Sequence, residues 1–174
     1  EYANKERAWS EKETAHAEKE RAGAELRQLI ETANAPIFGV DADGRVTEWN
    51  AKAAAITGYA KAEAMGEDLV ARFIHADQQA SVRAVLGKAL RGEETSNYEL
   101  PLYTKSGERV EVLLNATTRR DTTGQTLGVV GVGQDITELK AGKAELQRVA
   151  NELTLLIDTA NAPIFGIDAG GLVN

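Results

Sequence analysis

Apolar and polar residues alternate in several short stretches of the chain, which predicts β-strands. Alternation with a period of two places neighbouring side chains on opposite faces of a sheet. It is clearest between Thr95 and Tyr103, where Tyr98, Leu100 and Leu102 share one face. The five predicted strands are Ile37 to Val40, Arg45 to Trp49, Thr95 to Tyr103, Arg109 to Arg119 and Leu127 to Gln134. Turn sequences containing glycine join the first two strands and the last three, which favours antiparallel pairing.

Between the second and third predicted strands the apolar spacing changes to that of helices. Asn50 is expected to cap a short helix, and Asp77 is expected to begin a longer one. The apolar stripe of the longer helix has i, i+3, i+4, i+8 spacing and consists of Val82, Val85, Leu86 and Leu90. Two strands, then helices, then three strands predict an α+β fold, a five-stranded antiparallel sheet with helices on one face.

Long helices are predicted on both sides of this domain. Residues 1–33 are charged and rich in alanine, with an apolar stripe that becomes firm only near Leu26 and Leu29. Residues 136–160 form the second helix, and Asp135 is expected at its start because Glu138 follows at the spacing of a capping box. The first helix could hold a neighbour through its last turns only.

The second helix carries a seven-residue repeat of apolar positions. Leu139, Leu146, Leu153 and Ala160 take one heptad position, and Gly142, Val149 and Leu156 take the other. This period fits a partner helix better than a twisted sheet, although packing on the domain's own sheet stays an alternative. A parallel homodimer is expected, and its interface residues are Leu26, Leu29, Leu139, Leu146, Val149, Leu153 and Leu156.

The chain contains one passage twice. Leu29 to Val46 reads LIETANAPIFGVDADGRV, and Leu156 to Val173 reads LIDTANAPIFGIDAGGLV, at an offset of 127 residues (156 − 29). This offset is the size of a domain and too long for a solenoid repeat. The expected organisation is a linker helix at 1–33, a domain at 34–135, a coiled-coil helix at 136–160 and the start of a second domain at 161–174.

Composition excludes several classes of function. A net charge of −7 without a Lys- or Arg-rich tract argues against binding to nucleic acid or an anionic membrane. The absence of cysteine removes disulfides, thiolate nucleophiles and Cys-ligated zinc, and it suits a cytoplasmic protein. The two histidines, His16 and His75, stand far apart, and no metal site is expected. No catalytic constellation is visible, so an enzyme is not expected within this chain.

Residues 29 to 138 resemble the PAS domain, a sensory fold of histidine kinases, cyclases and phototropin-type receptors. The matching segments, in order, are ANAPIFGVDADGRVTEWN, AAAITGY, FIHADQQ, YTKSGERV and GVGQDIT. The resemblance implies that Asp135, Ile136 and Thr137 lie where the sheet ends and a signalling helix begins. They are therefore the expected signal-transmission residues. It also implies a partnership with adjacent PAS and output domains of the same protein.

The resemblance also bears on cofactors. The segment that carries the reactive cysteine in light-sensing LOV domains reads EDLVARFIHADQ here. The positions that hold the flavin ring edge in that branch correspond to Leu102, Val112 and Gly133, which offer no hydrogen bonds from side chains. The position of the haem histidine corresponds to Val82. His75 is interpreted as a loop or cap residue, and the alternative for it is a ligand or a pH sensor. No LOV-type flavin, haem or other cofactor is therefore expected.

These patterns lead to one functional hypothesis and two alternatives. The hypothesis is a regulatory PAS module that dimerises through its flanking helices and transmits a conformational change to a downstream domain. The alternatives are a sensor for an apolar, non-covalent small ligand and a passive scaffold for protein contacts. The residues expected to line a ligand pocket are Leu86, Leu102, Val112, Leu114 and Val130.

Overall fold

A computed structural model of the chain describes residues 2–159, and the predicted start of a second domain at 161–174 lies outside them. The helices are α1 (Tyr2–Thr32), α2 (Ala51–Thr57), α3 (Lys61–Ala64), α4 (Leu69–Phe73), α5 (Ala76–Leu90) and α6 (Thr137–Thr159). The strands are β1 (Ile37–Asp41), β2 (Val46–Trp49), β3 (Thr95–Tyr103), β4 (Arg109–Arg120) and β5 (Thr126–Asp135). The chain divides into two compact units, one ending at Ile136 and the other beginning at Thr137.

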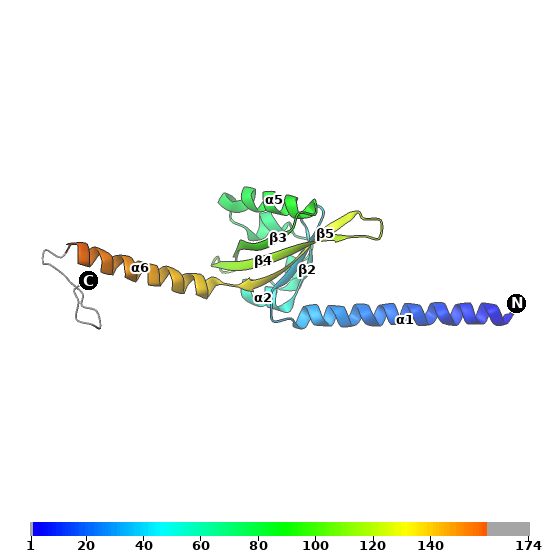
Figure 1. Cartoon of the computed structure of the whole chain (residues 1–174). Helices are drawn as coiled ribbons and strands as arrows, with labels where there is room; N and C mark the ends of the chain where they lie inside the picture. The colour runs from blue at the N-terminus through cyan, green and yellow to red at the C-terminus, as the bar shows by residue number, and fades with distance from the viewer. Residues whose placement is uncertain (1, 160–174) are drawn as a thin grey trace, which may run out of the picture. The chain divides into compact units, whose positions relative to one another are not determined.

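The five strands form one antiparallel sheet in the order β2-β1-β5-β4-β3, which confirms the predicted α+β architecture. The first and last strands of the domain, β1 and β5, are neighbours in the middle of the sheet. Helix α5 lies over one face of the sheet (Figure 1) and contacts β3, β4 and β5. Because α5 brings its apolar stripe to that face, the core forms between the two layers.

Aromatic side chains form the centre of this core. Trp49 is fully buried and stacks on Phe73 with ring centroids 5.0 Å apart, and Tyr59 meets Phe73 edge-on at the same distance. The indole N–H of Trp49 donates to the carbonyl oxygen of Tyr59 at 3.1 Å, so its polar atom is satisfied. These contacts attach α4 and the loop between α2 and α3 to the sheet.

Asn50 joins three elements and is itself fully buried. Its Oδ1 accepts from the backbone N–H of Ile37 at 2.9 Å and from that of Ala53 at 3.0 Å, and the second bond caps α2 as predicted. Its Nδ2 donates to the carbonyl oxygens of Ile30 at 3.0 Å and Ala35 at 2.9 Å. One side chain therefore ties the end of α1 to the start of β1 and of α2.

At Gly128, β5 leaves no room for a side chain beside β1. It pairs with Asp41 and has φ = +154°. A Cβ atom there would overlap the carbonyl oxygen of Val40 and lie 2.9 Å from the Cα of Asp41. Only glycine fits this point of the sheet.

Helix α6 has no buried residue, and its large apolar side chains are 40 to 75% exposed. It begins at Thr137, so Asp135 is not its first residue as the capping-box spacing suggested. Asp135 instead ends β5, where it pairs with Val112 of β4. No helix within residues 2–159 is both long enough and apolar enough to cross a lipid bilayer.

Candidate functional site

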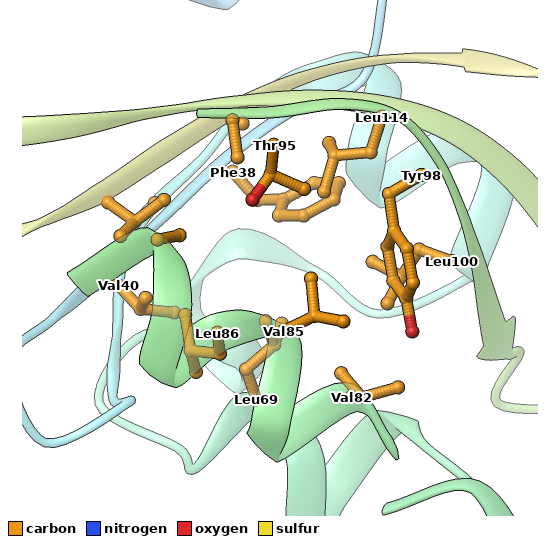
Figure 2. A pocket seen from close by; sticks show the side chains of 15 residues that line it. Phe38, Val40, Leu69, Val82, Val85, Leu86, Thr95, Tyr98, Leu100 and Leu114 are labelled. Carbon is orange, nitrogen blue, oxygen red and sulfur yellow. The ribbon is translucent and has the colours of Figure 1, made fainter. Parts of the chain in front are cut away.

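A small cavity lies in the core between α5 and the sheet. Its volume is about 40 Å³ and its wall is apolar. Figure 2 shows Val85 and Leu86 reaching into this space from α5, with Phe38 and Leu114 on the side of the sheet. A space of this size admits a few atoms, whereas pockets for drug-sized ligands have volumes of roughly 300–1,000 Å³.

Two of the five predicted pocket residues line this cavity, namely Leu86 and Leu114. Leu102 and Val112 are also buried, at 1% and 0% exposure, but they belong to the core beside the cavity. Val130 does not line it. A Cβ built on Gly39 would meet Glu48 and Val130 together, which places Val130 on the opposite face of the sheet.

The lining residues that β5 contributes are Val129 and Gly131. They pair with Val40 and Phe38, whose buried side chains face the same layer. A Cβ on Gly131 would come within 2.7 Å of Leu114 Cδ1, so the missing side chain provides the space that Leu114 fills. The alternation of β5 was hard to predict because glycines occupy its inward positions.

The second candidate site is the joint where the sheet continues toward α6. Gly133 N–H donates to the carbonyl oxygen of Pro36 at 2.9 Å, and Ile136 N–H donates to that of Glu111 at 2.8 Å. Ile136 is buried, at 7% exposure, so it is anchored to the domain by both packing and a hydrogen bond. The side chain of Glu111, also buried, forms an ion pair with Arg109 at 2.5 Å.

This joint brings the beginning and the end of the domain together. Residues just before β1 and the last residues of β5 are held by the same backbone hydrogen bonds. The predicted signal-transmission residues Asp135 and Ile136 lie here, and Thr137 is the first residue of α6. A movement of β4 or β5 would therefore act directly on the residues that precede α6.

Sequence comparison decides the family of this fold. The family model described as the PAS fold matches residues 24–136, which is more than half of the chain. The chain belongs to the PAS family. The resemblance noted in the sequence is thus confirmed.

This PAS domain is similar to part of the phytochromes and to solved PAS domains. The chain is 39% identical over 151 residues to phytochrome B of Arabidopsis thaliana; the match covers 83% of this chain and 13% of the phytochrome's length. Its structure matches a PAS domain from Colwellia psychrerythraea with a TM-score of 0.60 and 17% identity, covering 66% of this chain and 97% of that one. It also matches a domain of a sensory box sensor histidine kinase/response regulator from Geobacter sulfurreducens with a TM-score of 0.53 and 24% identity, covering 66% and 94%.

The three positions expected to correspond to the flavin ring edge of LOV domains carry no polar side chain. They are the aliphatic Leu102 and Val112 and the side-chain-free Gly133. Leu102 and Val112 are buried in the core, and a Cβ on Gly133 would overlap Cγ1 of Val112. The polar edge of an isoalloxazine would lose hydrogen bonds against these groups, at about 1–3 kcal/mol for each unpaired polar atom. Val82, expected at the position of the haem histidine, is an apolar residue of the cavity wall.

His75 of the PAS domain lies at the N-terminal end of α5 and is exposed. Its Nδ1 is 2.6 Å from Oδ1 of Asp77, and this hydrogen bond holds the pKa of Asp77 below its usual value. The imidazole ring also lies against Tyr103, with centroids 5.4 Å apart. His75 occupies the N-cap position of α5, but its side chain makes no capping hydrogen bond.

Proposed function

We propose that the chain is a regulatory PAS module that associates through its flanking helices and relays a conformational change from its sheet to a downstream domain. The sensory role of the PAS family supports the general assignment. The exposed apolar stripe of α6 carries the more specific one. Adjacent PAS and output domains of the same protein are the expected recipients of the signal.

The stripe consists of large apolar side chains at heptad positions that are left in solvent. We call these residues the heptad stripe: Leu139, Leu146, Val149, Leu153 and Leu156. Their exposed fractions run from 40 to 75%, on a helix that buries nothing of its own. Covering a leucine stabilises an interface by about 1.5–3 kcal/mol, so a second copy of the same stripe is a suitable partner. In α1, Leu26 and Leu29 are exposed in the same way, at 59% and 67%.

Charges beside the heptad stripe favour a parallel pair. With Leu146 at position a, the g positions hold Glu138, Glu145 and Glu152. An antiparallel pair would set g positions against one another and bring glutamates together, whereas a parallel pair sets Glu138 against Lys143 of the partner at position e. Arg148 pairs with Glu145 at 2.7 Å and holds the pKa of that carboxyl below its usual value, so Glu145 stays charged near neutral pH.

Substitution of the heptad stripe should dissociate the pair. Leu146→Glu removes one leucine from each chain, about 3 kcal/mol in all, so we expect the dimer Kd to rise about 100-fold or more. Light scattering over a range of concentrations measures this, beside a chain cut at Glu138. Gln147→Glu, which adds the same charge one residue away and off the stripe, is the control and should leave the Kd nearly unchanged. A wild-type chain that stays monomeric at high concentration would refute the proposed association.

Single cysteines report the orientation, because the natural chain contains none. In a parallel pair, Leu139→Cys chains form a disulfide with one another on oxidation. In an antiparallel pair, Leu139→Cys chains alone form no disulfide, and a disulfide forms only when they are mixed with Leu156→Cys chains. The second pattern would contradict the parallel arrangement.

The joint at Asp135 to Thr137 supports the relay part of the proposal. The last pair of the β4–β5 ladder joins Val112 to Asp135, and the next residue, Ile136, is fixed to Glu111. A switch requires two arrangements of this joint that differ by only a few kcal/mol. Ile136→Pro removes the N–H that donates to Glu111, so in the full-length protein it should change output activity while dimers persist. Unchanged output with intact dimers would instead support the passive scaffold.

A sensor of an apolar, non-covalent ligand is the second candidate, and the core cavity is the observation that favours it. The cavity admits only a few atoms without rearrangement. We propose that the module works without flavin or haem, because aliphatic residues occupy the positions expected to hold these cofactors. A clean absorbance spectrum and a native mass equal to that of the polypeptide would support the relay. A colour or an adduct mass would support the ligand sensor.

A further inference from the structure

We infer that the last two turns of α6 carry a docking surface for a second PAS module of the same chain, with Ile157 as its central residue. This surface is distinct from the heptad stripe, and its occupant is the segment that begins beyond Thr159. This docking does not require that two chains associate, so it is independent of the proposed dimer. It rests on the internal repeat together with the contacts that its first copy makes.

The ends of α1 and α6 correspond residue by residue at the offset of 127. Leu26 corresponds to Leu153, Leu29 to Leu156, Ile30 to Ile157, Glu31 to Asp158 and Thr32 to Thr159. Both threonines donate a side-chain hydrogen bond to the carbonyl four residues earlier, at 2.9 Å in α1 and 2.6 Å in α6. The two helix ends therefore have the same local structure as well as similar sequences.

In the first copy, at the end of α1, some of these residues contact the domain and others are exposed to solvent. Ile30 is half-buried, and its carbonyl oxygen accepts from Nδ2 of the buried Asn50 at 3.0 Å. Glu31 pairs with Nζ of Lys61 at 3.2 Å, which adds a contact on the same side. Leu29, one residue before Ile30, is 67% exposed. The end of α1 thus turns its isoleucine and glutamate toward the module that follows it and leaves its leucine in solvent.

In the second copy, the corresponding isoleucine is more than half exposed. Ile157 is 55% exposed, and it lies outside positions a and d of the heptad, so pairing of the heptad stripe does not account for it. The residues after Thr159 read ANAPIFGIDAG, nearly the same as the ANAPIFGVDAD that follows Thr32. The same sequence placed after the same helix end calls for the same contact.

The chemistry of the occupant follows from the first copy. It needs an asparagine amide, buried at the start of its first short helix, to donate to the carbonyl of Ile157 as Asn50 does to Ile30. It also needs an ammonium group facing Asp158, as Lys61 faces Glu31. Helix α6 would then belong to two modules at once, as the exit of the first and the support of the second.

The test uses the natural protein continued through the second module. Ile157→Asp should lower the melting temperature of that module and speed amide exchange in residues 155–159 by about ten-fold or more. Leu155→Asp is the matched control, because Leu155 is 62% exposed but corresponds to the undocked Gln28. The control should leave the second module unchanged, and it should not weaken association through Leu146 and Leu153.

Two results would overturn the inference. One is an equal effect of Ile157→Asp and Leu155→Asp on the second module. The other requires no substitution: residues 155–159 would exchange as fast in the longer natural protein as they do in this chain. A monomeric protein with slow exchange at Ile157 would leave the docking surface intact and refute only the dimer.

Discussion

Replacing Gly128 by alanine is expected to cost the module about 3–5 kcal/mol of unfolding free energy, or to prevent folding altogether. The new Cβ would overlap the carbonyl oxygen of Val40 and crowd the Cα of Asp41. Both neighbours are backbone atoms of β1, so neither can rotate away as the end of a side chain would. The strands would have to separate and lose ladder hydrogen bonds, in addition to the strain at φ = +154°.

Urea unfolding of the purified chain measures this loss, and Gly124→Ala provides the control. Gly124 also has positive φ, at +86°, but its missing Cβ would meet nothing within 4 Å. Gly124→Ala should therefore lower the unfolding free energy only by the conformational strain, about 1–2 kcal/mol. Similar losses for the two variants would show that β1 and β5 leave room for a side chain at Gly128.

Replacing Asn50 by aspartate should have the second-largest effect, about 3 kcal/mol. An aspartate keeps an acceptor for the N–H groups of Ile37 and Ala53, but it has no N–H to offer the carbonyl oxygens of Ile30 and Ala35. These carbonyls would face a carboxylate oxygen, and a buried group left unpaired costs about 1–3 kcal/mol. Because the carboxylate is unfavourable there, the loss should shrink as the pH falls and the group becomes protonated.

Asn151→Asp is the matched control for Asn50, since Asn151 is exposed on α6 and bonds only to Gln147 among the contacts described. Its effect should stay within about 0.5 kcal/mol. Unfolding in urea at neutral and mildly acidic pH separates the two variants. If Asn50→Asp were as mild as the control, the buried bonds between α1 and the domain could not be holding the two together.

Local sequence patterns predict most of the fold. Strand β3 has the predicted bounds, Thr95 and Tyr103, because its alternation is regular and its ends are marked by turns. Asn50 was predicted as a helix cap, and it is one. Its bonds to Ile30 and Ala35 could not be predicted, because they link residues 15 to 20 positions apart that only the folded chain brings together.

The misassigned positions have physical reasons. In β5, glycines at 128, 131 and 133 conceal the alternation, so Val130 was assigned to the face that Val129 and Gly131 occupy. Asp135 has the spacing of a helix cap, but pairing with Val112 keeps it in the sheet. The size of the cavity depends on how side chains such as Leu114 fill the space above the glycines. No pattern of residue types along a strand contains that information.

The adjacency of β1 and β5 has a consequence for how such proteins evolve. The first and last strands of the sheet are neighbours. A gene segment that runs from the end of one flanking helix to the end of the next therefore encodes every strand of one complete sheet. Tandem duplication of that segment would add a complete domain and leave the topology of the existing domain unchanged. The offset of 127 residues between the two passages corresponds to one such unit.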